Sequence, residues 1–254
     1  MNEYKKRWQL KNKAKDLLTG HYSETALLTF LYGLFLIADL MINSVIMCYM
    51  PGESDNLLRI LLMEITPGGY LIASGLSLLT SILFGILGVG IAFVYLSIAC
   101  RQPYSMKHLF LGFRENPVNY LLLALVTALI RFFFQFPAMA CNYFYLLDTN
   151  NQWMLLYYIC NLAGQLAMLP LTLGLAQSVR LLLDYPDLSA RKAIIGSFRL
   201  MKGHKTRYFL LTLSFLPLEL AAAFTFGIGY LWLAPYQNMT YTLFYLDLME
   251  NQPS

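Results

Sequence analysis

Apolar residues gather in six long blocks that are separated by short polar stretches. The blocks cover residues 25–49, 70–99, 118–147, 153–183, 207–226 and 230–247. Each block is close to or above the roughly 20 helical residues needed to cross the hydrocarbon core of a bilayer. The pattern predicts an all-α polytopic membrane bundle of six transmembrane helices, in a single integral membrane domain over residues 1–254. The sixth block is the shortest and contains Pro235.

Two basic segments outside these blocks also have helical periodicity. In residues 1–24, a stripe at helical spacing is formed by Leu10, Ala14, Leu17 and Leu18. In residues 189–203, "SARKAIIGSFRLMKG", a second stripe contains Ala190, Ala193, Ile194, Ser197, Phe198 and Met201. Apolar stripes beside lysines and arginines are typical of amphipathic helices that lie on a membrane surface. We therefore expect two such helices on the cytoplasmic face.

The small share of charged residues supports a membrane location. The chain is 58% hydrophobic and 13% charged, whereas soluble domains carry about 25% charged residues. A charge deficit of this size indicates that much of the surface faces lipid.

Lysine and arginine positions predict the orientation, because cytoplasmic loops are enriched in them. Sixteen of the eighteen lie in three regions. Two predicted spans separate each region from the next, so all three lie on the same side of the membrane. They are Lys5, Lys6, Arg7, Lys11, Lys13 and Lys15; Arg101, Lys107 and Arg114; and Arg180, Arg191, Lys192, Arg199, Lys202, Lys205 and Arg207. Both termini are expected in the cytoplasm. The loops 50–69 and 148–152 are expected outside, the first with a short amphipathic helix.

Basic residues at the inner surface are candidates for contact with lipid headgroups. They are Lys11, Lys15, Arg191, Arg199, Lys202, His204 and Lys205. Attraction to anionic lipid is worth about 1 kcal/mol for each lysine or arginine near the surface. It explains the basic charge without a nucleic acid, which we do not expect as a partner. The expected partners are membrane lipids with anionic headgroups, and another membrane protein or a second copy of the chain.

Three charged residues lie inside apolar blocks and form a second candidate site. At about 1.5 Å per residue, Asp39, Arg131 and Glu219 lie at similar depths of roughly 18–21 Å from the inner end of their blocks. An unpaired charge there costs about 3 kcal/mol, so we expect pairing, in which Asn43 could join. Two interpretations remain open: a structural ion pair that fixes helix register, and a polar site for a substrate or proton.

Motifs of catalysis are missing from the sequence. No HExxH, G-x-S-x-G or P-loop pattern occurs, the three histidines are far apart, and the four cysteines form no CxxC. We expect no catalytic residue, cofactor or metal site. The favoured function is a non-catalytic membrane protein that acts through lipids or partner proteins. The alternatives are a small transporter or channel-like component, and a lipid-modifying intramembrane enzyme.

Several segments resemble a known family. Residues 10–32 "LKNKAKDLLTGHYSETALLTFLY", 109–113 "LFLGF", 197–215 "SFRLMKGHKTRYFLLTLSF" and 224–248 "FTFGIGYLWLAPYQNMTYTLFYLDL" carry the resemblance. They resemble domain-of-unknown-function family 975, bacterial integral membrane proteins distantly similar to the membrane domains of some glycerophosphodiester phosphodiesterases. The resemblance implies a bacterial cell-membrane location and no catalytic residues. The segment "LPLE" at 216–219 departs from the family pattern, which puts Glu219 in doubt as a family feature.

Overall fold

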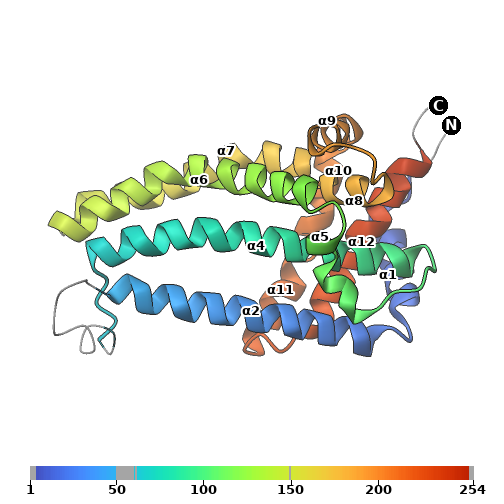
Figure 1. Cartoon of the computed structure of the whole chain (residues 1–254), viewed down its shortest axis with the longest axis horizontal. Coiled ribbons are helices and arrows are strands. Elements are labelled where there is room, and N and C mark those ends of the chain that lie inside the picture. The colour runs from blue at the N-terminus through green and yellow to red at the C-terminus, as the bar shows by residue number, and fades with distance from the viewer. Residues whose placement is uncertain (1–3, 50–59, 61, 149, 252–254) are drawn as a thin grey trace. The chain divides into compact units, whose positions relative to one another are not determined.

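The computed structural model describes residues 4–49, 60, 62–148 and 150–251 (Figure 1). The regular elements named within these ranges are all helical. They are α1 (Arg7–Leu18), α2 (Tyr22–Cys48), α4 (Pro67–Ala99), η1 (Met106–Phe110), α5 (Leu111–Arg114), α6 (Pro117–Asp148), α7 (Asn151–Leu175), α8 (Ser178–Asp184), α9 (Ala190–Leu200), α10 (Lys205–Leu213), α11 (Leu216–Phe224) and α12 (Tyr230–Glu250). Residues 50–59 and 61, where a loop helix was expected, lie outside the described residues.

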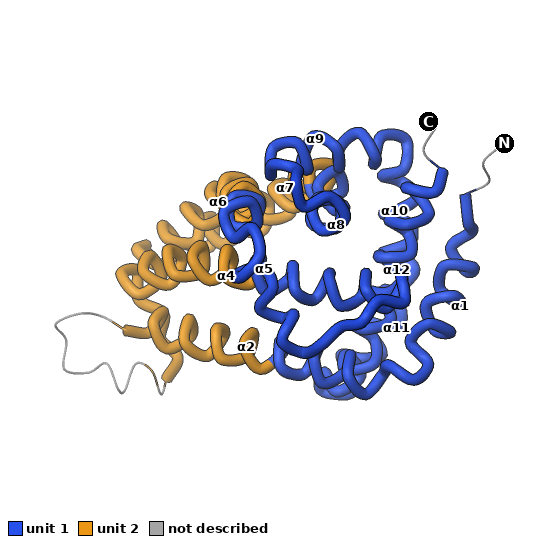
Figure 2. The backbone as a smooth tube through the Cα atoms, turned by 45° about the vertical axis from the view of Figure 1, so that its right-hand side comes forward, with its two compact units in different colours: residues 1–33, 85–123, 172–254 blue, residues 34–84, 124–171 orange. Residues whose placement is uncertain are grey.

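The described chain divides into two compact units, coloured separately in Figure 2. Unit 1 contains residues 1–33, 85–123 and 172–254, and unit 2 contains residues 34–84 and 124–171. Helices α2, α4, α6 and α7 each contribute residues to both units. The sequence predicts a single domain, and the helices of that domain run through both of these units.

Five helical segments of the described residues are long and apolar enough to cross a membrane. They are Tyr22–Cys48, Pro67–Ala99, Pro117–Asp148, Asn151–Asp184 and Lys205–Phe224. Each coincides with one predicted block to within three residues at either end. The prediction of an all-α fold is confirmed, and the prediction of six apolar spans is wrong.

The block at 230–247 does form a helix, α12, but its surroundings differ from those of a lipid-facing span. It carries Gln237, Asn238 and Asp247, and polar residues reduce its hydropathy. Its middle is buried inside unit 1, including Tyr236, Met239, Thr240, Leu243, Phe244, Tyr245 and Leu248. A helix that is covered by protein needs no uniformly apolar surface, because its side chains meet other side chains and not lipid.

Helices α10, α11 and α12 form an antiparallel hairpin in unit 1. The ring of Tyr208 in α10 lies 5.1 Å from that of Phe244, and the ring of Phe215 lies 5.2 Å from that of Tyr236. Further along, the Tyr230 hydroxyl of α12 donates to Glu219 O in α11 at 3.4 Å. Contacts therefore proceed along α12 in the direction opposite to that along α10 and α11. The hairpin brings the end of α12 back to the start of α10.

Both predicted amphipathic helices form, and their apolar stripes face protein. In α1, Leu10, Ala14 and Leu18 are buried, and the helix packs along α12. In α9, Ala193 lies in a core cluster with Val89, Leu111, Tyr120 and Leu182. The expectation that these stripes rest on lipid is not met, because other helices of unit 1 cover them.

Gly90 in α4 allows close approach of η1 and provides a test of this packing. A Cβ atom at residue 90 would lie 2.2 Å from Leu109 O and 2.5 Å from His108 O, whereas one at Gly88 would meet nothing within 4 Å. We expect Gly90→Ala to cost about 1–3 kcal/mol and to lower the melting temperature of the detergent-solubilised protein. Gly88→Ala is the matched control and should leave it unchanged or raise it, because alanine favours helix. Equal melting of the two variants would contradict the close contact.

Candidate functional site: a basic pocket beside α1

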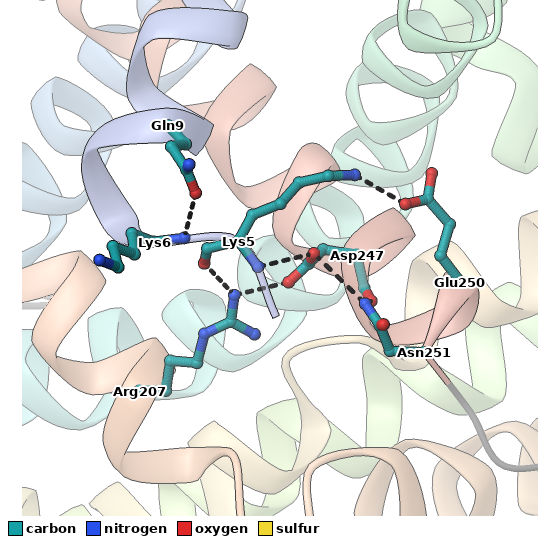
Figure 3. Close-up of polar contacts among 7 residues, drawn as sticks. All are labelled: Lys5, Lys6, Gln9, Arg207, Asp247, Glu250 and Asn251. Atoms are coloured by element: carbon teal, nitrogen blue, oxygen red, sulfur yellow. Dashed lines mark hydrogen bonds and ion pairs between the residues drawn. The ribbon is translucent and has the colours of Figure 1, made fainter. Parts of the chain in front are cut away.

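A buried ion pair joins the two ends of the described chain in unit 1 (Figure 3). The side chain of Asp247 is 1% exposed, and its Oδ2 lies 2.5 Å from Arg207 Nη2. Its Oδ1 accepts a hydrogen bond from the backbone N–H of Lys5 at 3.1 Å. Arg207 Nη2 also donates to the carbonyl of Lys5 at 2.5 Å. One carboxylate thus holds the N-terminal segment, α10 and α12 together.

Weaker contacts surround this pair. Lys5 Nζ lies 2.6 Å from Glu250 Oε2, in an ion pair whose side chains are 36% and 59% exposed. The guanidinium carbon of Arg207 lies 5.1 Å from the ring centre of Tyr4 and 4.9 Å from that of Phe244. Arg207 Nη1 is buried and has no hydrogen-bond partner among the described residues. The faces of the two rings offset this loss by cation–π attraction.

Beside the pair lies a basic pocket of about 620 Å³. The described residues that line it are Tyr4, Lys5, Lys6, Arg7, Trp8, Lys11, Arg207 and Ser214, of which five are cationic and none is acidic. We call this cavity the basic pocket. Trp8 lines the basic pocket and is 60% exposed. In such a position an amphipathic ring can meet both apolar and polar surroundings.

Three of the five cations have no counter-charge among the described residues. Lys5 and Arg207 are paired with acids, whereas no ion pair joins Lys6, Arg7 or Lys11 to any described acidic residue. Lys11 Nζ donates to Ser214 O at 2.9 Å. Burial, followed by the positive charges of Arg7 and Lys15, lowers the pKa of Lys11. The pocket therefore has a surplus of positive charge that an anion would relieve.

A second polar pocket, of about 820 Å³, lies at the other end of α1. Its lining mixes the acids Asp16 and Glu24 with Arg101 and His21. The Tyr104 hydroxyl donates to Glu24 Oε2 and lies 2.7 Å from His21 Nδ1. Because its charges are mixed, this pocket is a poorer anion site than the basic pocket.

Neither pocket has the donor set of a metal centre. The described residues contain no group of three or more His, Cys, Asp or Glu side chains that could hold a metal ion.

Comparison with known proteins identifies the family. A family model described as "Protein of unknown function (DUF975)" matches residues 1–252. The chain belongs to the DUF975 family. No curated protein matches it, and no solved structure matches it.

The predicted intramembrane charges of this DUF975 protein occupy three separate environments. In unit 2, Asn43 Nδ2 donates to Asp39 Oδ1 at 3.0 Å, and Ser77 Oγ donates to Asn43 Oδ1 at 3.1 Å. Arg131 is exposed in α6, and no ion pair joins it to Asp39 or to another described acid. Glu219 belongs to unit 1, where it accepts from Gln237. Asp39 and Asn43 come together, and the expected pair of Asp39 with Arg131 does not form.

Of the predicted headgroup residues, only Lys11 lines the basic pocket. Lys15 Nζ lies 5.4 Å from the ring centre of Tyr236, and Lys205 Nζ lies 5.2 Å from that of Phe198. The ring of His204 lies 4.6 Å from that of Tyr4. The remaining three are exposed in and just after α9: Arg191, Arg199 and Lys202.

The residues that complete the site are not predicted as a cluster from the sequence: four are basic residues that indicate only the orientation, and the fifth is an aspartate. They are Lys5, Lys6, Arg7, Arg207 and Asp247. One signal was available, since Asp247 is the only acidic residue of the block 230–247. An acid at the end of an apolar helix needs a partner, and an antiparallel hairpin places a residue near 207 opposite it.

Removal of the Asp247 carboxylate should destabilise the DUF975 protein strongly. Asp247→Asn leaves Arg207 partly buried without its counter-ion, at a cost of about 3–5 kcal/mol. Thermal unfolding in detergent measures the loss. Glu250→Gln is the control, because it removes only the exposed ion pair, worth about 0–1 kcal/mol. Equal melting temperatures of the two variants would show that the Asp247–Arg207 ion pair contributes no more to stability than the exposed ion pair.

Stability should also decrease in mild acid through His204. Burial, followed by the charge of Arg207, lowers the pKa of His204 below its ordinary value, against an opposing effect of Asp247. Between the two pKa values the unfolded chain binds more protons than the folded one, so stability falls as pH drops below about 6.5. His204→Gln should flatten the melting temperature over this range. An unchanged slope in that variant would exclude His204 as its source.

Proposed function

We propose that this protein is a non-catalytic integral membrane protein that binds an anionic phospholipid headgroup in the basic pocket, with both termini in the cytoplasm. The observation that carries the proposal is the unpaired positive charge of Lys6, Arg7 and Lys11 around one cavity. Five apolar helical segments support a membrane location. Cytoplasmic surfaces of bacterial membranes present anionic headgroups, which attract such clusters.

Two further features support the orientation and the ligand. The ion pair of Lys5 with Glu250 holds the two ends of the described chain together, which favours one side of the membrane for both. The exposed indole of Trp8 beside the cations fits the boundary between headgroups and acyl chains. The relationship to glycerophosphodiester phosphodiesterase membrane domains stays a prediction, and a non-catalytic accessory role would agree with it.

Lipid binding in the basic pocket can be tested with two triple variants of equal charge change. The pocket variant is Lys6→Gln, Arg7→Gln, Lys11→Gln, and the control is Arg191→Gln, Arg199→Gln, Lys202→Gln. Each protein is delipidated, titrated with phosphatidylglycerol or phosphatidylcholine, and examined by native mass spectrometry. At about 1 kcal/mol for each cation, the pocket variant should bind phosphatidylglycerol about a hundredfold more weakly. The control should lose less than about threefold.

The outcomes separate the proposal from general surface attraction. Equal losses in the two triple variants would show that lipid follows overall charge and not the basic pocket. Equal binding of phosphatidylcholine and phosphatidylglycerol by the unmodified protein would overturn an anionic headgroup as the ligand. A conductance or substrate flux that is lost with Asp39→Asn would favour the transporter alternative.

A further inference from the structure

A second positive charge lies in the core of unit 1, where no described acidic residue forms an ion pair with it. Arg180 in α8 is only 8% exposed. Its Nε donates to Thr242 Oγ1 at 3.3 Å, and its Nη1 donates to Ala176 O at 3.2 Å and to Gln177 Oε1 at 3.3 Å. All three partners are neutral. Removing a guanidinium from water without a counter-charge is costly, by several kcal/mol in real proteins.

The nearest acid along the helix does not neutralise Arg180. Asp184 lies one turn further in α8, and its Oδ2 accepts from the Tyr245 hydroxyl at 2.5 Å. No described acidic group forms an ion pair with Arg180. The Asp184 carboxylate is therefore bound to Tyr245 of α12 and forms no ion pair with the guanidinium of Arg180.

The tyrosines around Arg180 are not counter-ions either. Tyr208, Tyr241 and Tyr245 lie near its charge. Burial raises the pKa of Tyr241 to about 12 and, with the Asp184 contact, raises that of Tyr245 further. Their phenols stay neutral at physiological pH. The carbonyl of Ala176 follows the C-terminal end of α7, whose dipole offsets part of the charge but does not cancel it.

One completely buried hydrogen-bond donor in this place has no partner among the described residues. The side chain of Gln177 is completely buried, and its Nε2 donates to nothing among the described residues. The hydrogen bonds of Arg180 engage Nε and Nη1, and its Nη2 is not among the described buried atoms that lack a partner. Since Gln177 Oε1 accepts from Arg180 Nη1, the amide with the unused donor is in direct contact with the guanidinium. Buried donors without partners are rare in native proteins.

We propose that a small inorganic anion of about the size of chloride binds at the guanidinium of Arg180 and the side-chain amide of Gln177. The anion supplies the missing counter-charge and accepts a hydrogen bond from the unused donor of Gln177. A lipid headgroup does not fit, because so little of Arg180 reaches the surface. This anion is structural: it stabilises α8 against α12 and acts independently of the basic pocket.

Chloride-dependent stability tests the proposal. The detergent-solubilised protein is melted in sodium chloride and in sodium gluconate at equal ionic strength, because gluconate is too large for a buried site. A ligand that binds only the folded state raises its stability with concentration. We expect the melting temperature to be about 5 °C higher in 0.2 M chloride. Equal melting of the unmodified protein in the two salts would overturn the proposal and favour a bound water.

Gln177→Glu distinguishes the anion site from salt effects on the rest of the surface. The new carboxylate is isosteric and lies beside Arg180, so it replaces the anion within the chain. This variant should melt higher than the unmodified protein in gluconate and should lose the chloride dependence. Gln152→Glu, at an exposed position in α7, is the matched control and should keep it. A chloride dependence that persists in Gln177→Glu would place the anion elsewhere and refute the assignment.

Discussion

The ion pair between Asp247 and Arg207 is the interaction on which the organisation of unit 1 depends. Asp247 neutralises a cation at the start of α10 and also binds the backbone of Lys5. The pair therefore closes the hairpin of α10, α11 and α12 and fixes the segment that leads into α1. With that segment fixed, α1 lies along α12 and covers it. A buried charge pair stabilises little by itself, but its directional bonds specify which helices meet.

The same pair explains why the basic pocket carries unpaired charge. Lys5 and Arg207 are neutralised by acids near the end of α12, while Lys6, Arg7 and Lys11 line the same pocket without an ion pair to a described acid. Burial lowers the pKa of Lys11, and repulsion from the like charges of Arg7 and Lys15 lowers it further. The ion pair between Asp247 and Arg207 fixes the segment that carries these cations and so keeps them close together. An anion that binds in the pocket reduces the repulsion among these cations and is therefore bound favourably.

How much could be predicted from the sequence depends on whether a residue meets lipid or protein. The five apolar spans were predicted because lipid imposes a uniform composition over about 20 residues. The block at 230–247 was wrongly predicted as a span because burial by protein also favours apolar residues. Helix α12 is buried by neighbouring helices and therefore tolerates Gln237 and Asn238. The stripe of α9 gave the right helix and the wrong surroundings. A stripe such as that of Ala193 records burial, and it cannot reveal whether lipid or protein provides it.

Charged residues were harder to place, because their partners are set by tertiary contacts between distant segments. Asp39 and Arg131 were matched by depth alone, yet depth fixes one coordinate of three, and Asp39 instead contacts Asn43 one turn away. Arg180 fell inside the predicted block 153–183 but was counted with the loop that follows. Had it been treated as a charge within an apolar block, its burial would have been expected. A buried cation in that position needs a counter-charge. No described acid of unit 1 forms an ion pair with Arg180, and the counter-charge that we propose is therefore a bound anion.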